Sequence, residues 1–260
     1  MRIALVGAGN VANCMAGALV EAGHDIVCVF SRTMEHAVSL AGRVNAVPVT
    51  SFDALEDADV YISMLTDDAL LSCAGKMVRQ HPTSLFLHTS GSIPLSVWTD
   101  AGASRCGVLY PMQTFSRGKQ VDWKAVPVFI EASTHQDCET VQRIASSLSG
   151  NVTYLDSEKR GLLHLAAVFA CNFTNRMYAI SAGLLERCGI PFGVMQPLID
   201  ETCAKAAVIP PSEGQTGPAV RGDRRVMDMH LELLEGTPEW RRLYELISED
   251  IIRNRNGRKN

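Results

Sequence analysis

Apolar residues in the first 155 positions occur in short runs, and longer segments with helical spacing separate these runs. The runs predict strands, in chain order, at 2–6, 25–30, 60–64, 85–88, 105–109, 126–131 and 151–154. Between the first two strands, apolar residues from Val11 to Ala22 share one helical face, and Gly23 ends that helix. Strands that alternate with helices predict a doubly wound, parallel α/β sheet with both faces covered.

Beyond position 155 the pattern is helical only, with predicted helices at 157–188, 192–208, 224–234 and 238–252. A loop rich in proline and glycine, 210–218, separates the second pair from the first. The sequence therefore predicts two domains, an α/β domain over 1–155 and an all-helical domain over 156–260. No apolar run is long enough for a signal peptide or a membrane span, so we expect a cytoplasmic protein with no membrane partner.

A glycine-rich turn follows the first predicted strand and opens the first predicted helix. It consists of Gly7, Ala8, Gly9, Asn10, Val11 and Ala12, a GxGxxA motif. Gly7 permits the tight turn, Gly9 lets a diphosphate approach the backbone, and the small Ala12 lets the helix pack against the strand. The helix N-terminus then offers free N–H groups to the anion. The alternative is that the glycines serve only the turn. The position of the motif favours a Rossmann fold that binds a dinucleotide.

The end of the second strand indicates which dinucleotide binds. An NAD site places an acidic residue there, whereas this strand ends in Ser31, Arg32 and Thr33. A guanidinium with neighbouring hydroxyls suits a 2′-phosphate, which favours NADP over NAD. The alternative is that Arg32 is a solvated residue at a helix start. We expect further backbone contacts to the cofactor from Leu65 and Thr66, and helix capping by Asp67 or Asp68.

Candidate catalytic residues occur at a strand end and on the long helix. His88 and Ser90 follow the strand 85–88 and are suited to donating a proton or polarising a carbonyl or imine. A strand cap and a turn are the alternative roles. On the helix 157–188, His164 lies in one polar stripe with Cys171, Asn175 and Tyr178, with Asn172 on its flank. A buried polar stripe needs partners, which are a substrate or a neighbouring surface.

Charge and cysteine content exclude other classes of protein. The net charge is −4, and neither half of the chain has the positive excess that selects a nucleic acid. The eight cysteines show no CxxC pair and no His/Cys cluster at metal-ligand spacing. We therefore expect no nucleic-acid partner, no metal and no disulfide.

Several motifs together resemble a known bacterial family. They are Gly7–Ala12, 88–91, 110–115, 164–173, and the segment 216–223 with its Thr-Gly-Pro and Arg-Gly-Asp triplets. Proteins with these motifs join a Rossmann-like domain to a helical domain of unknown function and are often described as candidate NADP oxidoreductases. The chain is more distantly similar to pyrroline-5-carboxylate reductases, 6-phosphogluconate and β-hydroxyacid dehydrogenases, and deazaflavin-dependent NADP reductases. The resemblance implies an N-terminal cofactor domain, a helical C-terminal domain and a dimer that shares helices.

The chain departs from the hydroxyacid dehydrogenases at their catalytic lysine. Those enzymes carry it on the long helix, four residues before an asparagine, whereas here His164 and Asn172 are eight apart and only Lys159 lies near the helix start. For the segment 216–223, we expect structural tethering, with Asp223 as a cap and Arg221 toward an anion or a carboxylate.

The leading hypothesis is an NADP-dependent oxidoreductase that acts on a small carbonyl, imine or hydroxyacid. His88 and Ser90 would orient the acceptor, with His164 as acid and Asn172 as hydrogen-bond donor. The alternatives are an NADP-binding sensor without turnover and a deazaflavin-dependent NADP reductase. The long apolar helix exceeds what a 105-residue domain covers alone, which predicts a homodimer through the helical domain.

Overall fold

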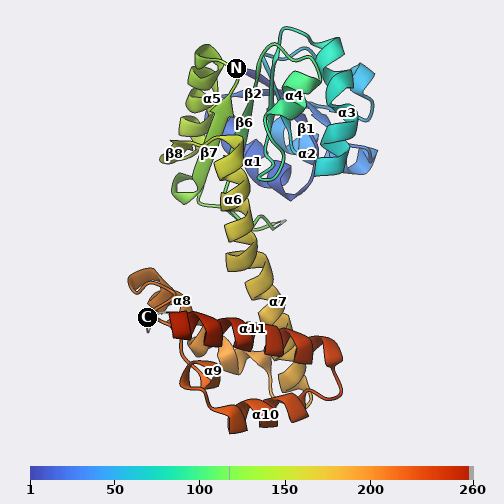
Figure 1. The fold of residues 1–260 in the computed structure, drawn as a ribbon. Helices are drawn as coiled ribbons and strands as arrows, with labels where there is room; N and C mark the ends of the chain where they lie inside the picture. Colours follow the sequence, from blue (N-terminus) through green and yellow to red (C-terminus); the bar gives the residue numbers. More distant parts are fainter. Residues whose placement is uncertain (117, 258–260) are drawn as a thin grey trace. The chain divides into compact units, whose positions relative to one another are not determined.

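The computed structural model describes residues 1–116 and 118–257 of the chain. They form two compact units, Met1–Cys171 and Asn172–Asn260. The first unit contains an eight-stranded sheet, and the second is helical (Figure 1). The predicted fold class, a Rossmann-type α/β sheet with an all-helical C-terminal region, is confirmed.

The strands run in the order β3-β2-β1-β4-β5-β6-β7-β8. Their bounds are β1 Arg2–Val6, β2 Asp25–Phe30, β3 Val47–Val49, β4 Val60–Ser63, β5 Leu85–His88, β6 Cys106–Pro111, β7 Pro127–Ala132 and β8 Asn151–Tyr154. All neighbours are parallel except β6 and β7, which are antiparallel. A fully parallel sheet was expected. Between β6 and β7 the described residues contain only a short 3-10 turn, Trp123–Ala125, and none of them forms the crossover helix that a parallel connection usually needs.

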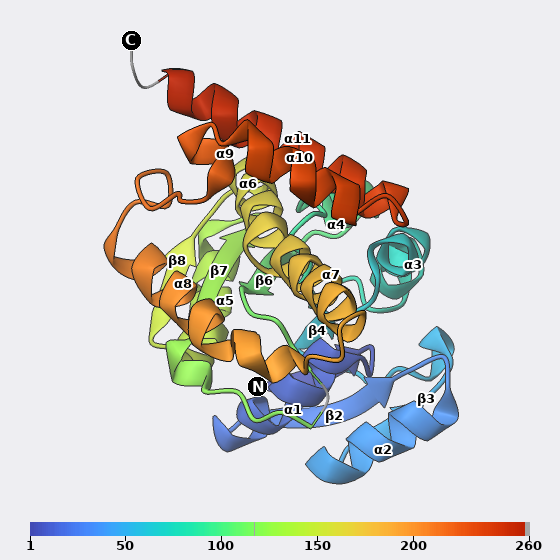
Figure 2. The same ribbon diagram turned by 90° about the horizontal axis from the view of Figure 1, so that it is seen from below.

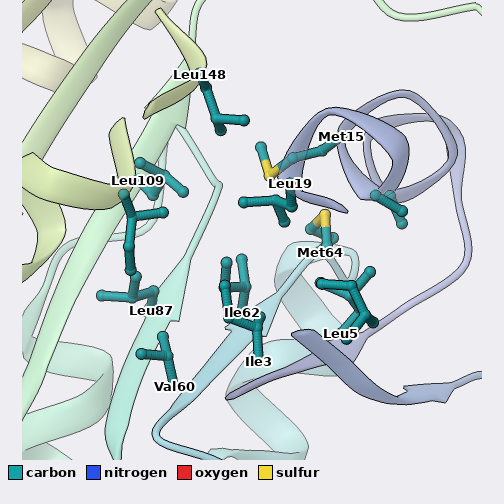
Figure 3. Packing of buried hydrophobic residues seen from close by; sticks show 14 of the residues in the cluster. Ile3, Leu5, Met15, Leu19, Val60, Ile62, Met64, Leu87, Leu109 and Leu148 are labelled. Atoms are coloured by element: carbon teal, nitrogen blue, oxygen red, sulfur yellow. The ribbon is translucent and has the colours of Figure 1, made fainter. Parts of the chain in front are cut away.

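Helices cover both faces of the sheet. They are α1 Asn10–Glu21, α2 Met34–Val44, α3 Asp67–Gln80, α4 Ser96–Asp100 and α5 His135–Leu148, and α6 Ser157–Ala167 follows the last strand. Along β1, Ile3 and Leu5 face α1, α2 and α5, whereas Ala4 and Val6 face α3 and α4. Figure 3 shows part of the first core, where Met15 and Leu19 of α1 pack on β1 and β4. Burial on both faces explains why these strands are apolar throughout.

The carboxyl ends of three central strands are aligned. Val6 of β1 pairs with Ser63 of β4, and Ser63 pairs with His88 of β5. The loops after these strands therefore emerge at one edge of the sheet, which is the edge where open α/β sheets bind ligands.

The first compact unit extends beyond the last strand because α6 is attached to the sheet. Arg160 of α6 is 1% exposed and forms an ion pair with Glu131 of β7. The sequence pattern predicted a boundary at 155, where the strands end. The compact unit includes α6 and ends within the π-helical turn η3, Val168–Phe173.

The unit Asn172–Asn260 contains α7 Thr174–Glu186, α8 Gln196–Val208, α9 Pro218–Arg221, α10 Arg224–Leu233 and α11 Pro238–Gly257. The short α9 packs against both α10 and α11, as Figure 2 illustrates. The predicted single helix 157–188 is α6, η3 and α7 in succession. Because η3 is wound more loosely than an α-helix, the constant 100° spacing behind the polar stripe does not hold across it. In the described part of the chain, no helix is both long and apolar enough to cross a bilayer.

Candidate functional site

The turn between β1 and α1 has the geometry of an anion cradle. Gly7 has a φ of +124°, and a Cβ there would lie 2.7 Å from the carbonyl oxygen of Met64. A Cβ on Gly9 would meet nothing within 4 Å, so the space above this residue is open. Gly9 is the N-cap of α1 and provides no side-chain cap, and the first turn of α1 contains no acidic residue. The first N–H groups of the helix are therefore available to an anion.

A cavity of about 410 Å³ opens above this turn. Nine of the eleven residues predicted to bind the cofactor line it: Gly7, Ala8, Gly9, Asn10, Ser31, Arg32, Thr33, Leu65 and Thr66. The other two, Val11 and Ala12, are absent from its lining. Ala12 is fully buried, as the close packing of helix on strand requires, and Val11 packs against the core. Asn13, His36, Met64 and Ala69 also line the cavity and were not predicted.

Arg32 lies where this cavity meets a second one. The second cavity, about 450 Å³, is lined by Phe30, Phe52, Asp68, Ser72 and Cys73 in addition to the shared Arg32, Leu65, Thr66 and Ala69. The rings of Phe30 and Phe52 stack at 4.3 Å between centroids. The Arg32 side chain is exposed and has no partner among the described residues, so its guanidinium is available to a ligand.

The loop after β5 is fixed by Asp67, the first residue of α3. Its carboxylate accepts hydrogen bonds from the Ser90 hydroxyl at 2.8 Å and from the Ser92 hydroxyl at 2.5 Å. Asp67 or Asp68 was expected to cap α3, but the N-cap residue is Thr66, and both aspartates lie in the first turn of the helix. Thr66 lines the first cavity, and its neighbour Asp67 binds Ser90 and Ser92. The start of α3 therefore connects that cavity to the loop after β5.

The Ser90 hydroxyl has no capacity left for a substrate. It donates to Asp67 and accepts from the backbone N–H groups of Ser92, at 3.2 Å, and Ile93, at 3.1 Å. A hydroxyl has one proton and two lone pairs, so these three bonds use all of them. This arrangement favours a positioning role for Ser90, which shapes the turn that contains Gly91.

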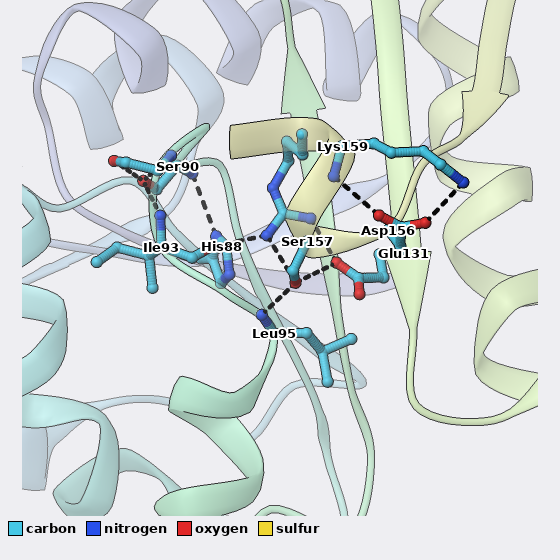
Figure 4. A network of polar contacts seen from close by, with 10 residues as sticks. His88, Ser90, Ile93, Leu95, Glu131, Asp156, Ser157 and Lys159 are labelled. Carbon is cyan, nitrogen blue, oxygen red and sulfur yellow. Dashed lines mark hydrogen bonds and ion pairs between the residues drawn. The ribbon is translucent and has the colours of Figure 1, made fainter. Parts of the chain in front are cut away.

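His88 is completely buried at the end of β5 (Figure 4). Its Nδ1 accepts a hydrogen bond from the backbone N–H of Ser90, and its Nε2 has no hydrogen-bond partner. Burial, reinforced by the nearby Arg160 cation, lowers the pKa of His88 to about 3. The ring is therefore neutral at physiological pH. It can support the Ser90 turn, but it cannot serve as a cationic acid.

His164 of α6 lies beside this turn and contacts Tyr110 of β6. The Tyr110 hydroxyl and the Nδ1 atom of His164 are 3.2 Å apart, with the rings edge to face. His164 also packs closely against Gly91, where a Cβ would lie 2.6 Å from Nδ1 and 2.7 Å from Cγ of His164. Burial raises the pKa of Tyr110, so its hydroxyl keeps its proton. The His164 side chain is only partly buried, and no hydrogen bond within the described residues uses its Nε2.

A buried ionic network holds α6 against the sheet (Figure 4). Arg160 pairs with Glu131 and also donates to the carbonyl oxygen of Ile93 at 2.6 Å. The Ser157 hydroxyl donates to Glu131 at 2.7 Å and accepts from the backbone N–H of Leu95 at 2.9 Å. Because the network joins α6, β7 and the loop after β5, it fixes the position of His164 four residues further along α6.

The other predicted site residues lie in the helical unit. Asn172 is its first residue. In the segment 216–223, Asp223 is the N-cap of α10 and accepts from the N–H of Val226 at 3.3 Å, as expected for a cap. Arg221 has no partner among the described residues and its role stays a prediction. Residues 1–116 and 118–257 include no group of His, Cys, Asp and Glu side chains arranged to hold a metal ion.

Sequence reasoning missed the pairing of Tyr110 with His164 and the buried network around Arg160. The signal for Glu131 was a charge in an otherwise apolar strand, since buried charges are almost always paired. Arg160 follows two other charged residues, so its burial had no such signal.

Two family descriptions match the chain. "NADP oxidoreductase coenzyme F420-dependent" matches residues 2–87, and a "domain of unknown function" matches residues 126–251. Over 97% of its length the chain is 46% identical to a candidate NADP oxidoreductase from Bacteroides fragilis, 98% of which is covered, with a TM-score of 0.92. The chain belongs to this NADP oxidoreductase family. The match confirms the predicted resemblance to the Rossmann-like NADP oxidoreductases with a helical C-terminal domain, and with it the prediction of NADP as the cofactor of the family. No protein with a curated description matches.

More distantly similar solved structures share the fold. A reductive aminase from Aspergillus terreus, in complex with NADPH and ethyl-5-oxohexanoate, is 16% identical, with 97% of this chain and 93% of that chain covered and a TM-score of 0.69. An imine reductase from Streptomyces aurantiacus is 14% identical, with both chains fully covered and a TM-score of 0.69. At this identity the likeness shows the shared architecture.

Proposed function

We propose that this family member binds NADPH at the two joined cavities and reduces a small carbonyl or imine beside His164. The observation that carries the proposal is the open space above Gly9 at an uncapped helix N-terminus, next to the unpaired Arg32. An anionic dinucleotide fits this arrangement, because the backbone N–H groups hold its diphosphate and a Cβ at either glycine would obstruct the turn or the ligand.

The two cavities divide the cofactor between them. The first takes the diphosphate over Gly7, Ala8 and Gly9, and the second takes the adenine near Phe52. Arg32 lines both, so a 2′-phosphate at their junction lies beside its guanidinium, which matches phosphate oxygens with two N–H groups. This geometry supports NADP over NAD.

The chemistry needs a proton donor opposite the hydride donor. Bound NADPH would supply the hydride to the carbon of the C=O or C=N group. His164 would give the proton on Nε2 to the oxygen or nitrogen of that group. The Tyr110 hydroxyl can accept from a charged ring and donate to a neutral one, so it keeps its contact with Nδ1 before and after the proton leaves. Asn172 is retained as a proposed hydrogen-bond donor to the substrate, and His88 and Ser90 as positioning residues.

Two variants test the two halves of this proposal. Arg32→Ala should raise the dissociation constant for NADPH at least about tenfold and leave that for NADH nearly unchanged, since one charged hydrogen-bonded pair is lost. Calorimetric titration measures both. Equal weakening for the two cofactors would contradict the assignment of Arg32.

For the second half, NADPH oxidation is followed across a panel of ketones, aldehydes and cyclic imines. His164→Ala should lower kcat about 10²- to 10⁴-fold with NADPH affinity unchanged. Tight NADPH binding without turnover of any compound, together with a cofactor-dependent change of oligomer, would instead support the sensor hypothesis.

The family description that matches residues 2–87 supports a second candidate, hydride exchange between NADP and a deazaflavin. In that case NADP reduction depends on reduced coenzyme F420 and is absent with carbonyls and imines. The same panel, extended by reduced F420, separates the two reactions.

We further propose a homodimer formed through the helical unit. Within that unit, apolar side chains are extensively exposed, including Leu198 at 63%, Val208 at 79% and Leu233 at 68%. Monomeric proteins rarely leave so many large apolar side chains in water. Light scattering coupled to gel filtration tests this; a monomer at micromolar concentration would contradict it.

A further inference from the structure

The carbonyl groups of the phosphate-binding turn are held by a side chain from within α1. Asn13 is 9% exposed, and its Nδ2 donates to the carbonyl oxygen of Ala8 at 2.9 Å and to that of Gly9 at 3.0 Å. An amide NH₂ group has two protons, and each is used here. Although Asn13 lines the first cavity, it has no donor left for a phosphate.

Asn13 is oriented in turn by a residue from a different helix. Arg43, in the last turn of α2, donates to Oδ1 of Asn13 at 3.1 Å and to its backbone carbonyl oxygen at 3.3 Å. A guanidinium only donates and backbone carbonyls only accept, so the amide has one orientation that satisfies all its partners. Arg43 thereby determines that the NH₂ group of Asn13 faces the turn.

This arrangement has a consequence for an anion above Gly9. A phosphate is attracted by the N–H groups at the start of α1 and repelled by carbonyl oxygens that point toward it. The Asn13 side chain binds the Ala8 oxygen, and it shares the Gly9 oxygen with the backbone N–H of Asn13 at 2.9 Å, so both oxygens are engaged by α1 and are not turned toward the anion. The turn thus presents its N–H groups before any ligand arrives, and binding does not have to supply the energy to reorient it.

We propose that Asn13 and Arg43 are positioning residues for the cofactor diphosphate, and that Arg43 acts through Asn13. The inference rests on the proposed dinucleotide site. It differs from the role of Arg32, because the diphosphate is common to NADP and NAD whereas the 2′-phosphate is not. Loss of Asn13 or Arg43 should weaken both cofactors by the same factor and leave their ratio unchanged.

The test uses Asn13→Leu, which removes the amide without changing the charge, and Arg43→Met. Arg79→Met is the matched control, since Arg79 also lies in the last turn of a helix of the same sheet unit, α3, and has no contact with Asn13. Dissociation constants for NADPH and NADH are measured by calorimetry. Asn13→Leu and Arg43→Met should each raise both constants about fivefold, the effect of one neutral hydrogen bond. Arg79→Met should change neither by more than about twofold.

The double variant Asn13→Leu/Arg43→Met provides the decisive comparison. If Arg43 acts through Asn13, the double variant binds no more weakly than Asn13→Leu alone. Multiplying effects, a loss confined to NADPH, or an Arg43→Met variant that behaves like Arg79→Met would each overturn the proposal. If the wild type binds both dinucleotides and the Asn13 and Arg43 variants bind them equally well, only this inference is refuted. If the wild type binds neither dinucleotide, the proposed function is refuted and this inference with it.

Discussion

A methyl group added at Gly91 should displace His164. The Cβ of an alanine there would lie 2.6, 2.7 and 2.9 Å from Nδ1, Cγ and Cβ of His164. Ordinary contacts are about 3.5–4.0 Å, so the ring has to move by about 1 Å. Gly91 does not have a positive φ, so the added methyl group strains no backbone. The contact with His164 is therefore the whole cost, about 1–3 kcal/mol of unfolding free energy.

The same movement removes the hydrogen bond to Tyr110. Nδ1 is the ring atom nearest the added methyl group and also the atom 3.2 Å from the Tyr110 hydroxyl, so a shift of about 1 Å toward or away from that hydroxyl takes the pair out of the hydrogen-bonding range. On the proposed function, Gly91→Ala should lower kcat about 10²-fold, because a displaced donor costs about that much, while NADPH affinity stays unchanged.

A double-mutant cycle with His164→Ala tests the contact without knowledge of the substrate. Free energies of unfolding are obtained by urea titration for the wild type, both single variants and the double variant. In the His164→Ala background the contacts with Nδ1 and Cγ are gone and only the 2.9 Å approach to the Cβ of residue 164 remains, so Gly91→Ala should cost much less than it does in the wild type. The coupling energy should reach about 1–3 kcal/mol.

The control for this cycle is Gly42→Ala, an added methyl group in α2 that meets nothing within 4 Å. It should stabilise the protein equally with and without His164. Additive effects of Gly91→Ala and His164→Ala would refute the reasoning, because they would mean that the two residues do not touch.

Four further changes have expected outcomes. Gly7→Ala should cost about 2–4 kcal/mol of unfolding free energy, because of its φ of +124° and the clash with the Met64 carbonyl. Gly9→Ala should leave the denaturation midpoint unchanged and weaken NADPH binding, since a Cβ there meets no protein atom within 4 Å. Equal stability of the two variants would contradict this. Because the pKa of His88 is lowered to about 3, unfolding takes up a proton between about pH 6.5 and pH 3, so the protein loses stability as the pH is lowered through that window. Between pH 7 and pH 5, His88→Asn should avoid about 2 kcal/mol of the stability that the wild type loses. Parallel pH profiles of the two proteins would disprove this. Glu131→Gln leaves the Arg160 cation buried without its counter-ion and should cost about 3–5 kcal/mol in a urea titration; a loss below about 1 kcal/mol would show that the pair is not buried in solution.

Local features of the fold were readable from the sequence because their physics is local. The segment from Gly7 to Ala12 follows β1 directly and runs into α1, and Arg32 comes shortly after the end of β2, the next strand along the chain. Strand β3 was missed because it is only three residues long and contains Pro48. The direction of β7 was also missed, since apolar patterning carries no information on strand polarity.

The candidate site was harder to predict because its contacts link distant segments. Tyr110 and His164 are 54 residues apart, and the fit of His164 against Gly91 depends on how α6 is attached to the sheet. The π-helical turn η3 leaves no pattern of glycine or proline in the sequence, so the register change between His164 and Tyr178 was not foreseen.

The ion pair between Arg160 and Glu131 places His164 in the same compact unit as the sheet. It attaches the start of α6 to β7, which is antiparallel to β6. The antiparallel strand thus fixes the helix that carries His164. Tyr110, Gly91 and His164 thus form a preassembled group inside residues 1–171. On the proposed function, sequence change in the helical unit would therefore leave the proton donor and its two contacts intact.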